Sequence, residues 1–347
     1  MKNIMFITIF SLLLLTFGCS KSEFLNEGDF YYLEHKGAML PVWVKGNMDS
    51  DVLILTLHGG PGDSGMEQTI ALGFKYLEDE YMVAHWDQRY SGMSQGGYDE
   101  SVHTPDQYIE DTEMVVKLIQ EKYPDKKLFM IGHSWGGQLA AGYLGRDGHD
   151  DDFKGWIDLC GSIYGELESQ LMKEYILERV PEKLAEPDAD IEFWQFIVDW
   201  YEENPAPGNY SVGLPYHYVA ALGGDAYDWE QVQAENPTPY IELIFKSMFS
   251  FSFYTDAFYS EETMKKWDDI NYTPELNNIT IPSLMLWGAD DGVVPAGVAD
   301  YVYENLGTSQ MNKEVVKIPN CCHGPQHDQP EIFFEEVKDF VETYKNQ

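Results

Sequence analysis

The sequence is poor in basic residues and in cysteine. It has 22 lysines and arginines against 59 aspartates and glutamates, which gives a formal net charge of -37 at pH 7. Nucleic-acid binding needs a cluster of positive charge, so this balance argues against nucleic acid as a partner. The four cysteines show none of the cysteine and histidine spacings typical of zinc sites. We therefore expect no metal and no nucleic-acid partner.

Long apolar runs are also scarce, and outside the N-terminus none predicts a membrane-spanning helix. A short charged start precedes an apolar run over residues 4–17, followed by Gly18 and Cys19. This is the order of regions in a secretory signal, and the cysteine after Gly18 resembles the bacterial lipoprotein signal. The resemblance implies a signal peptide over 1–18, a lipid on Cys19, and an exported protein held on a bacterial membrane, periplasmic or at the cell surface. Secretion without an anchor and an uncleaved anchor are the alternatives.

Apolar segments alternate with helix-like segments along most of the chain. A hairpin is expected from Phe30 to Lys45, and a helix is expected from Thr104, a capping residue, to Tyr123. Six further segments are continuously apolar, as strands buried on both faces of a parallel sheet are. Repeated strand and helix units predict a doubly wound, mostly parallel α/β sheet. The six strands are Val52–Leu57, Met82–Trp86, Leu128–Ile131, Trp156–Leu159, Ser283–Trp287 and Val315–Ile318.

The alternation is lost in the middle of the chain, where tryptophan, tyrosine, phenylalanine and acidic residues dominate. This composition, with three helix-like runs, predicts an inserted helical cap. The expected organisation is a first part of the α/β core over 24–163, the cap over 164–278 and a second core part over 279–347. The last part ends in an amphipathic helix. The helical segments are Leu167–Glu178, Ile191–Glu203, Pro239–Phe251 and Glu331–Tyr344.

Residues 128–137 read LFMIGHSWGG, a buried strand that runs into G-x-S-x-G and then into a helix near Gln138. Such a turn holds its serine in a strained conformation, and the glycines on either side let strand and helix approach closely. We therefore predict that Ser134 is a nucleophile. The amide of Trp135 is the predicted donor to an oxyanion.

A glycine-rich loop follows the first parallel strand, with the sequence HGGPG over residues 58–62. Acyl transfer needs two backbone N–H groups that converge on one oxygen, and glycines permit that approach. Gly60 is the predicted second donor.

The combination of HGGPG, the triplet Asp87-Gln88-Arg89 and G-x-S-W-G resembles the prolyl iminopeptidase family of α/β hydrolases. The resemblance implies an α/β-hydrolase fold with an inserted cap and a serine hydrolase of aminopeptidase type. The family usually has glycine where this chain has Tyr90. We expect Asp87 and Arg89 to form an ion pair that braces the oxyanion loop.

Related families place the acid of the triad three residues after a glycine and four before a proline. Between Gly288 and Pro295 this selects Asp291, with Asp290 as the alternative. The base is expected after the last strand, and His323, seven residues before a proline as in the family, is preferred to His327. Ser134, Asp291 and His323 form the predicted triad, in the chain order of α/β hydrolases.

The substrate is less defined by the sequence. The family holds the ammonium group of its substrate with cap glutamates, one of which follows a tryptophan, as Glu230 follows Trp229 here. Glu166, Glu202 and Glu203 are other candidates. The first hypothesis is an exported aminopeptidase that releases an N-terminal residue, proline first, from a short peptide. An esterase, lactonase or amidase for small molecules is the second, and a non-catalytic surface binding protein is the third. No cofactor is expected, because the chain supplies every group.

Overall fold

The computed structural model describes residues 28–347 except 70, 206–213, 227–265 and 268. Nine described strands form one sheet in the order β1-β2-β4-β3-β6-β7-β8-β9, with β5 beside β2. The pairs on either side of β2 are antiparallel, and the pairs from β4 to β9 are parallel. The fold is thus the predicted doubly wound, mostly parallel sheet. The strands are β1 Asp29–His35, β2 Ala38–Gly46, β3 Val52–Leu57, β4 Met82–Trp86, β5 Gln95–Gly96, β6 Lys127–His133, β7 Gly155–Leu159, β8 Ser283–Gly288 and β9 Lys313–Ile318.

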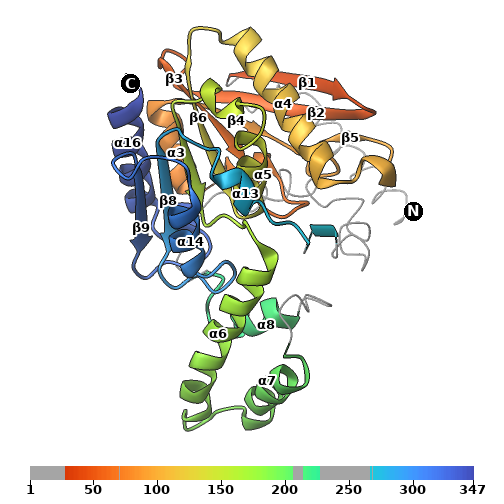
Figure 1. Cartoon of the computed structure of the whole chain (residues 1–347), viewed down its shortest axis with the longest axis vertical. Helices are drawn as coiled ribbons and strands as arrows, with labels where there is room; N and C mark the ends of the chain where they lie inside the picture. Colours follow the sequence, from red (N-terminus) through yellow and green to blue (C-terminus); the bar gives the residue numbers. More distant parts are fainter. Residues whose placement is uncertain (1–27, 70, 206–213, 227–265, 268) are drawn as a thin grey trace, which may run out of the picture.

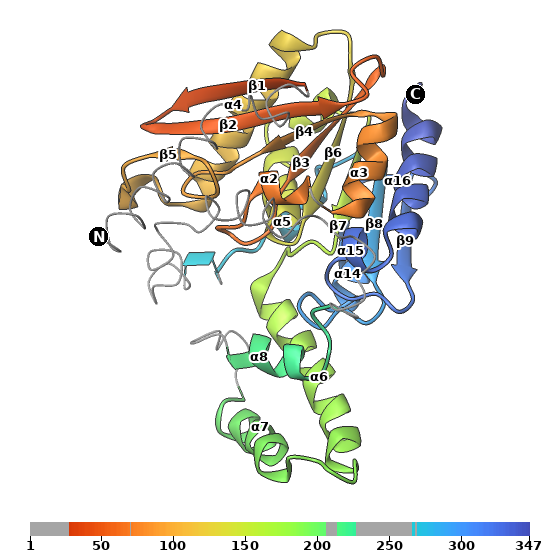
Figure 2. The ribbon, with the colours of Figure 1, turned by 180° about the vertical axis from the view of Figure 1, so that it is seen from behind.

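Helices cover both faces of the sheet, which explains the continuous apolarity of the strands. In β3, Leu53 and Leu55 join the core that includes residues of α4, α5 and α14, whereas Val52 and Ile54 join the core beneath α3 and α16. Figures 1 and 2 show these helices on opposite faces. The covering helices are α3 Leu72–Glu80, α4 Pro105–Lys122, α5 Trp135–Leu144, α14 Gly297–Asn305 and α16 Pro330–Tyr344.

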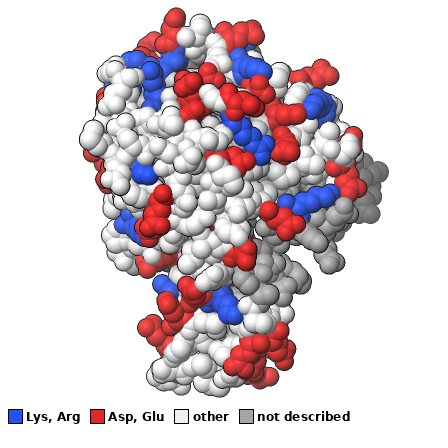
Figure 3. Space-filling view, in the orientation of Figure 1, with Lys and Arg blue, Asp and Glu red and all other residues white. Residues whose placement is uncertain are grey.

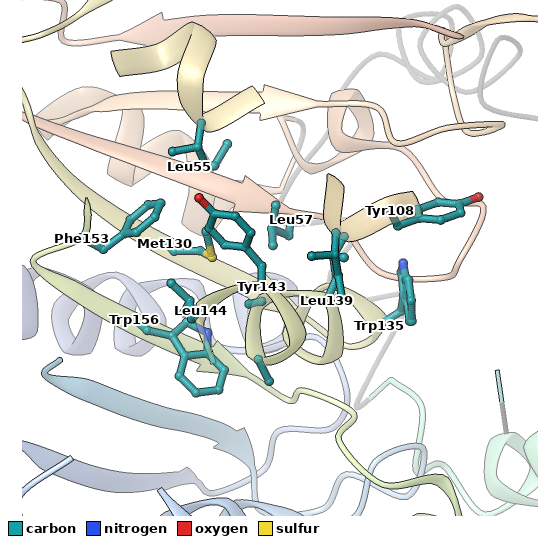
Figure 4. Close-up of a cluster of buried hydrophobic side chains, with 14 of the residues drawn as sticks. Leu55, Leu57, Tyr108, Met130, Trp135, Leu139, Tyr143, Leu144, Phe153 and Trp156 are labelled. Atoms are coloured by element: carbon teal, nitrogen blue, oxygen red, sulfur yellow. The ribbon is translucent and has the colours of Figure 1, made fainter. Parts of the chain in front are cut away.

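Helix α5 packs against the sheet within the first of these two cores. Leu139 and Tyr143 of α5 lie beside Leu57 of β3 and Met130 of β6, as Figure 4 shows. Each of the ten residues of α5 is buried. The helix that follows Ser134 is therefore fixed along its whole length.

The segment between β7 and β8 contributes helices that extend away from the sheet (Figure 1). They have an apolar cluster of their own, in which Ile176, Ile197 and Val219 are fully buried. The expected helices near 167–178 and 191–203 are present, whereas 239–251 lies outside the described residues, as do Cys19 and Glu230. The domain boundaries stay a prediction. The described cap helices are α6 Gly165–Leu184, α7 Ile191–Glu203 and α8 Leu214–Ala221.

The surface carries the excess of negative charge without a basic patch on the face shown in Figure 3. Lysines and arginines lie among the acidic side chains on this face. Within the described part of the chain, no helix is long and apolar enough to cross a membrane.

Candidate active site

Ser134 lies on the turn between β6 and α5, in a left-handed backbone conformation with φ 55° and ψ -124°. The turn leaves no room for side chains on its two glycines. A Cβ on Gly136 would lie 2.1 Å from the carbonyl oxygen of Leu57, and one on Gly132 would lie 2.4 Å from that of Gly136. The glycines are required by this close approach of α5 to β3 and β6, as the sequence predicts.

The glycine-rich loop lies beside Ser134. A Cβ on Gly59 would be 3.2 Å from the Cβ of Ser134, so this loop and the serine are in contact distance. Gly60 adopts a φ of 109°, and a side chain there would collide with the amide of Gly62. Trp135 is the first residue of α5, so its N–H has no acceptor within the helix. Trp135 is thus adjacent to Ser134, and Gly60 follows the glycine that lies against it, while the role of both as oxyanion donors stays a prediction.

Asp291 and His323 form a direct hydrogen bond. The Nδ1 atom of His323 lies 2.9 Å from Oδ2 of Asp291, and the other carboxylate oxygen accepts the amides of Val293 and Val294 at 2.9 and 3.0 Å. The Asp291 side chain is fully buried, and that of His323 is partly exposed. The three hydrogen bonds fix the carboxylate, so Nδ1–H points to it and Nε2 of the imidazole is left for another partner.

The loop of His323, the predicted base, is hydrogen-bonded to His133 in the serine turn. The Nε2 atom of His133 is 2.8 Å from the carbonyl oxygen of His323, and since a carbonyl only accepts, His133 donates. Burial lowers the pKa of His133 to about 3, so the ring is neutral at physiological pH. The two imidazole rings are 5.1 Å apart. This contact holds the loop of His323 against the residue that precedes Ser134.

The surroundings of His323 favour its charged form. Burial lowers the pKa of the imidazole, but the Asp291 carboxylate outweighs it, with smaller contributions from Asp63 and Glu168, and the net pKa is raised. The alternative His327 lies in α15 (Pro325–Asp328), and burial lowers its pKa to about 4. The described geometry therefore pairs Asp291 with His323.

The expected ion pair between Asp87 and Arg89 is wrong. The oxygens of Asp87 accept the hydroxyl of Ser64 and the amides of Gly65, Met66 and Met93, at 2.6 to 3.3 Å. Burial raises the pKa of this carboxyl to about 6, although these hydrogen bonds oppose the shift. Asp87 does brace the segment after the glycine-rich loop, but through neutral donors.

Arg89 instead makes a buried, bidentate ion pair with Asp111 of α4. Its Nε and one terminal nitrogen lie 2.9 and 2.8 Å from the two carboxylate oxygens, and it also donates to the carbonyls of His35 and Lys36. His35 adds a third contact to the same carboxylate, at 2.7 Å. Arg89 thus joins the first hairpin to α4.

Gln88, which lies between Asp87 and Arg89, braces the glycine-rich loop, as was expected of its two neighbours. Its side chain donates to the carbonyl of His58 at 2.9 Å and accepts the indole N–H of Trp135 at 2.8 Å. Its amide N–H donates to Nε2 of His58, whose Nδ1–H donates to the carbonyl of Gly59. Burial lowers the pKa of His58 to about 4, consistent with this neutral form. Gln88 therefore ties the glycine-rich loop to the start of α5.

Tyr90 has a φ of 61°, in the region that favours glycine. This explains why a glycine is usual at this position of the resembled family. The phenol of Tyr90 accepts the amide of Asp99 at 3.0 Å.

Three cysteines are described, and all are free and buried. The ligand atoms of Cys160, Asp291 and His323 lie within 4.8 Å of one another, a spacing that could hold a metal ion. Metals bind the thiolate form of cysteine, and burial raises the pKa of Cys160 well above its usual value, which disfavours that form. In the described geometry, Nδ1 of His323 and Oδ2 of Asp291 are already hydrogen-bonded to each other.

A mostly parallel sheet, a serine on a strained turn before a helix, and an Asp–His pair on loops after two later strands define the α/β-hydrolase class. Residues 52–330 match the alpha/beta hydrolase fold family, and the chain belongs to it. The chain is 23% identical over 299 residues to "Probable aminopeptidase YbaC" of Bacillus subtilis, covering 81% of this chain and 86% of that protein. It is 25% identical over 299 residues to the proline iminopeptidase of Saccharolobus solfataricus, covering 83% and 84%.

The fold is similar to solved structures of the same class. The proline iminopeptidase of Mycobacterium smegmatis superposes with a TM-score of 0.65 at 16% identity, over 92% of this chain and 99% of that one. The predicted fold class and the resemblance to prolyl iminopeptidases are confirmed. The chain is a hydrolase-family protein with relatives among aminopeptidases.

The Asp291–His323 hydrogen bond predicts which of two adjacent aspartates matters for activity. Asp291→Asn replaces the acceptor of the imidazole N–H and favours the wrong tautomer, so we expect kcat for a short-chain aryl ester to fall about 10⁴-fold. Asp290→Asn is the matched control, because no described side-chain contact joins its carboxylate to His323. A larger loss in Asp290→Asn than in Asp291→Asn would show that the acid is assigned to the wrong residue.

Proposed function

We propose that this protein is a serine hydrolase that works through an acyl-enzyme on Ser134. The observation that carries the proposal is the Asp291–His323 pair, whose loop is hydrogen-bonded to the residue before Ser134. A strained turn exposes the serine hydroxyl, and an imidazole oriented by a buried carboxylate is the general base that activates such a hydroxyl.

In the proposed reaction, each of these groups has one role. His323 accepts the proton of Ser134 as the hydroxyl oxygen bonds to the substrate carbonyl carbon. The N–H groups of Trp135 and Gly60 stabilise the negative charge on the carbonyl oxygen. His323 then gives the proton to the leaving amine or alcohol, and the carbon–heteroatom bond breaks. Water, activated by the same imidazole, hydrolyses the ester on Ser134 and restores the enzyme.

We further propose that the substrates are short peptides or amides with a free N-terminus, proline first. The relatives that are similar over most of the chain include proteins named proline iminopeptidase and a probable aminopeptidase. Glu230, the cap residue predicted to bind the ammonium group, is outside the described residues. Its role therefore stays a prediction.

A comparison of two substrates tests this proposal. We expect the purified protein to release nitroaniline from proline 4-nitroanilide, and Ser134→Ala to reduce the rate by a factor of about 10⁶ in kcat, because the nucleophile is lost. The same two proteins are assayed with a 4-nitrophenyl ester of a short acid. Turnover of the ester alone would favour the esterase hypothesis, and no Ser134-dependent turnover of either substrate would favour a binding protein.

We also propose that the protein is exported and held on a bacterial membrane by a lipid on Cys19. The support is the charged start, apolar run and Gly18-Cys19 of the sequence. Acyl chains on one residue would place the enzyme at a membrane surface without a spanning helix.

Lipid labelling tests the anchor. Cells fed a clickable fatty acid should label the wild-type protein and leave Cys19→Ser unlabelled, with that variant moving from the membrane to the soluble fraction. Cys160→Ser is the matched control, since Cys160 is buried in the core and should not affect labelling. Equal labelling of Cys19→Ser would refute the anchor at this residue.

A further inference from the structure

Asp63 lies directly after the glycine-rich loop and close to the serine. Its Oδ2 atom and the Cβ atom of Ser134 each lie 3.2 Å from the point that a Cβ on Gly59 would occupy. The two atoms are therefore separated by at most twice that distance. His133 borders the same point, with its Nδ1 atom 3.5 Å away. The Asp63 carboxylate therefore lies close to the side chain of Ser134, the candidate nucleophile.

Among the described residues, the Asp63 carboxylate has no hydrogen-bonding partner. Asp63 is exposed to solvent, and its side chain has no hydrogen bond or ion pair to any residue in the described part of the chain. The protein around the carboxyl nevertheless raises its pKa, while charged His323 lowers it. This combination is expected of a carboxyl that water reaches from one side only. A cation seated there would find a negative charge with unused hydrogen-bonding capacity.

The distance to Ser134 fits one kind of cation. In an N-terminal residue the α-nitrogen is about 2.5 Å from the scissile carbonyl carbon, two bonds away. That carbon approaches the attacking oxygen to about 3–3.5 Å before reaction, and a charge-assisted hydrogen bond adds about 2.8 Å. The acceptor must therefore lie within roughly 8 Å of the nucleophile. Asp63 meets this limit, whereas a charge several residues along a peptide would lie too far away.

Electrostatics also favours a cation at this place. A lone carboxylate near Ser134 opposes the negative charge that develops on the carbonyl oxygen during attack. A substrate ammonium group between the two would remove that penalty. The arrangement therefore favours substrates that carry a positive charge next to the reacting carbonyl over substrates that do not.

Glu168, and the described carboxylates that the sequence named (Glu166, Glu202 and Glu203), are less suited. Glu168, near the start of α6, is buried and already accepts Ser162 Oγ and the amides of Ile163 and Tyr164, at 2.5, 2.6 and 2.9 Å. The hydroxyl of Tyr164 donates to Glu166. Residues 202 and 203 end α7, which Figure 1 shows at the end of the cap remote from the sheet.

We propose that Asp63 binds the α-ammonium group of the substrate's N-terminal residue and so selects substrates with a free amine beside the scissile carbonyl. The proposal deepens the aminopeptidase function and rests on Ser134 as the nucleophile. It assigns amine recognition to the loop that also forms the oxyanion site, in addition to any contribution of the cap.

A pair of esters that differ only at the amine provides the test. The purified full chain is assayed with proline benzyl ester and with N-acetylproline benzyl ester, and the ratio of the two kcat/KM values is measured. We expect the wild type to prefer the free amine and Asp63→Asn to lower the ratio about 10- to 100-fold, as for the loss of a charged hydrogen bond. Asp63→Glu, which keeps the charge, should restore part of the ratio. Asp188→Asn removes an exposed carboxylate beyond the end of α6 and should leave the ratio unchanged.

The outcomes separate the two proposals. If the wild type cleaves both esters but not proline 4-nitroanilide, the aminopeptidase function fails while the ratio still tests Asp63. A wild type without preference for the free amine, or a ratio that is the same in Asp63→Asn, overturns the role of Asp63. An equal fall in Asp188→Asn does so too, because it would trace the effect to net charge. Cleavage of neither proline ester contradicts both proposals.

Discussion

The close approach of α5 to β3 and β6 is the constraint on which the candidate site depends. Gly132 and Gly136 allow backbone to meet backbone there, at distances that no side chain could share. The chain must then reverse at Ser134, and the left-handed φ of that residue is the result. Burial of all of α5 fixes the helix that the turn begins. The packing of α5 thus compensates for the strained backbone at Ser134.

The other parts of the site are connected to this turn by hydrogen bonds between uncharged groups. Gln88 joins the glycine-rich loop to Trp135, and His133 joins the loop of His323 to the residue before Ser134. Low pKa values keep His58 and His133 neutral, as their hydrogen bonds require. His323, with its pKa raised by Asp291, is the imidazole in this group that is prepared to accept a proton. The surroundings of the three imidazoles therefore separate His323, the proposed base, from His58 and His133.

Much of this could be predicted from the sequence, because continuous apolarity and motif spacing report local requirements. The bounds of β3 and β4 and of α7 agree with the predicted ranges, and the spacing that selected Asp291 and His323 leads to residues that hydrogen-bond. Helix α5 begins at Trp135 rather than near Gln138, since the turn at Ser134 is tighter than the pattern suggested. Helices α3 and α14 were not expected.

The failures concern contacts that only tertiary packing decides. Asp87 and Arg89 are two residues apart and oppositely charged, yet Arg89 pairs with Asp111, which lies in α4 and is 22 residues further along the chain. Nothing local in the sequence marks it as that partner. Asp63 is an ordinary loop aspartate until the glycine-rich loop folds against Ser134. Substrate selectivity is the property least visible in the sequence, because it depends on such positions.

The central claim is that Ser134 forms a covalent acyl-enzyme, and trapping that intermediate tests it most directly. The protein is mixed with excess 4-nitrophenyl acetate, quenched in acid within milliseconds to seconds, and digested for mass spectrometry. The account predicts one added acetyl group, located on Ser134 and absent from Ser134→Ala. An acetyl group on Cys321 or Cys322 instead, or turnover without any covalent adduct, would contradict it.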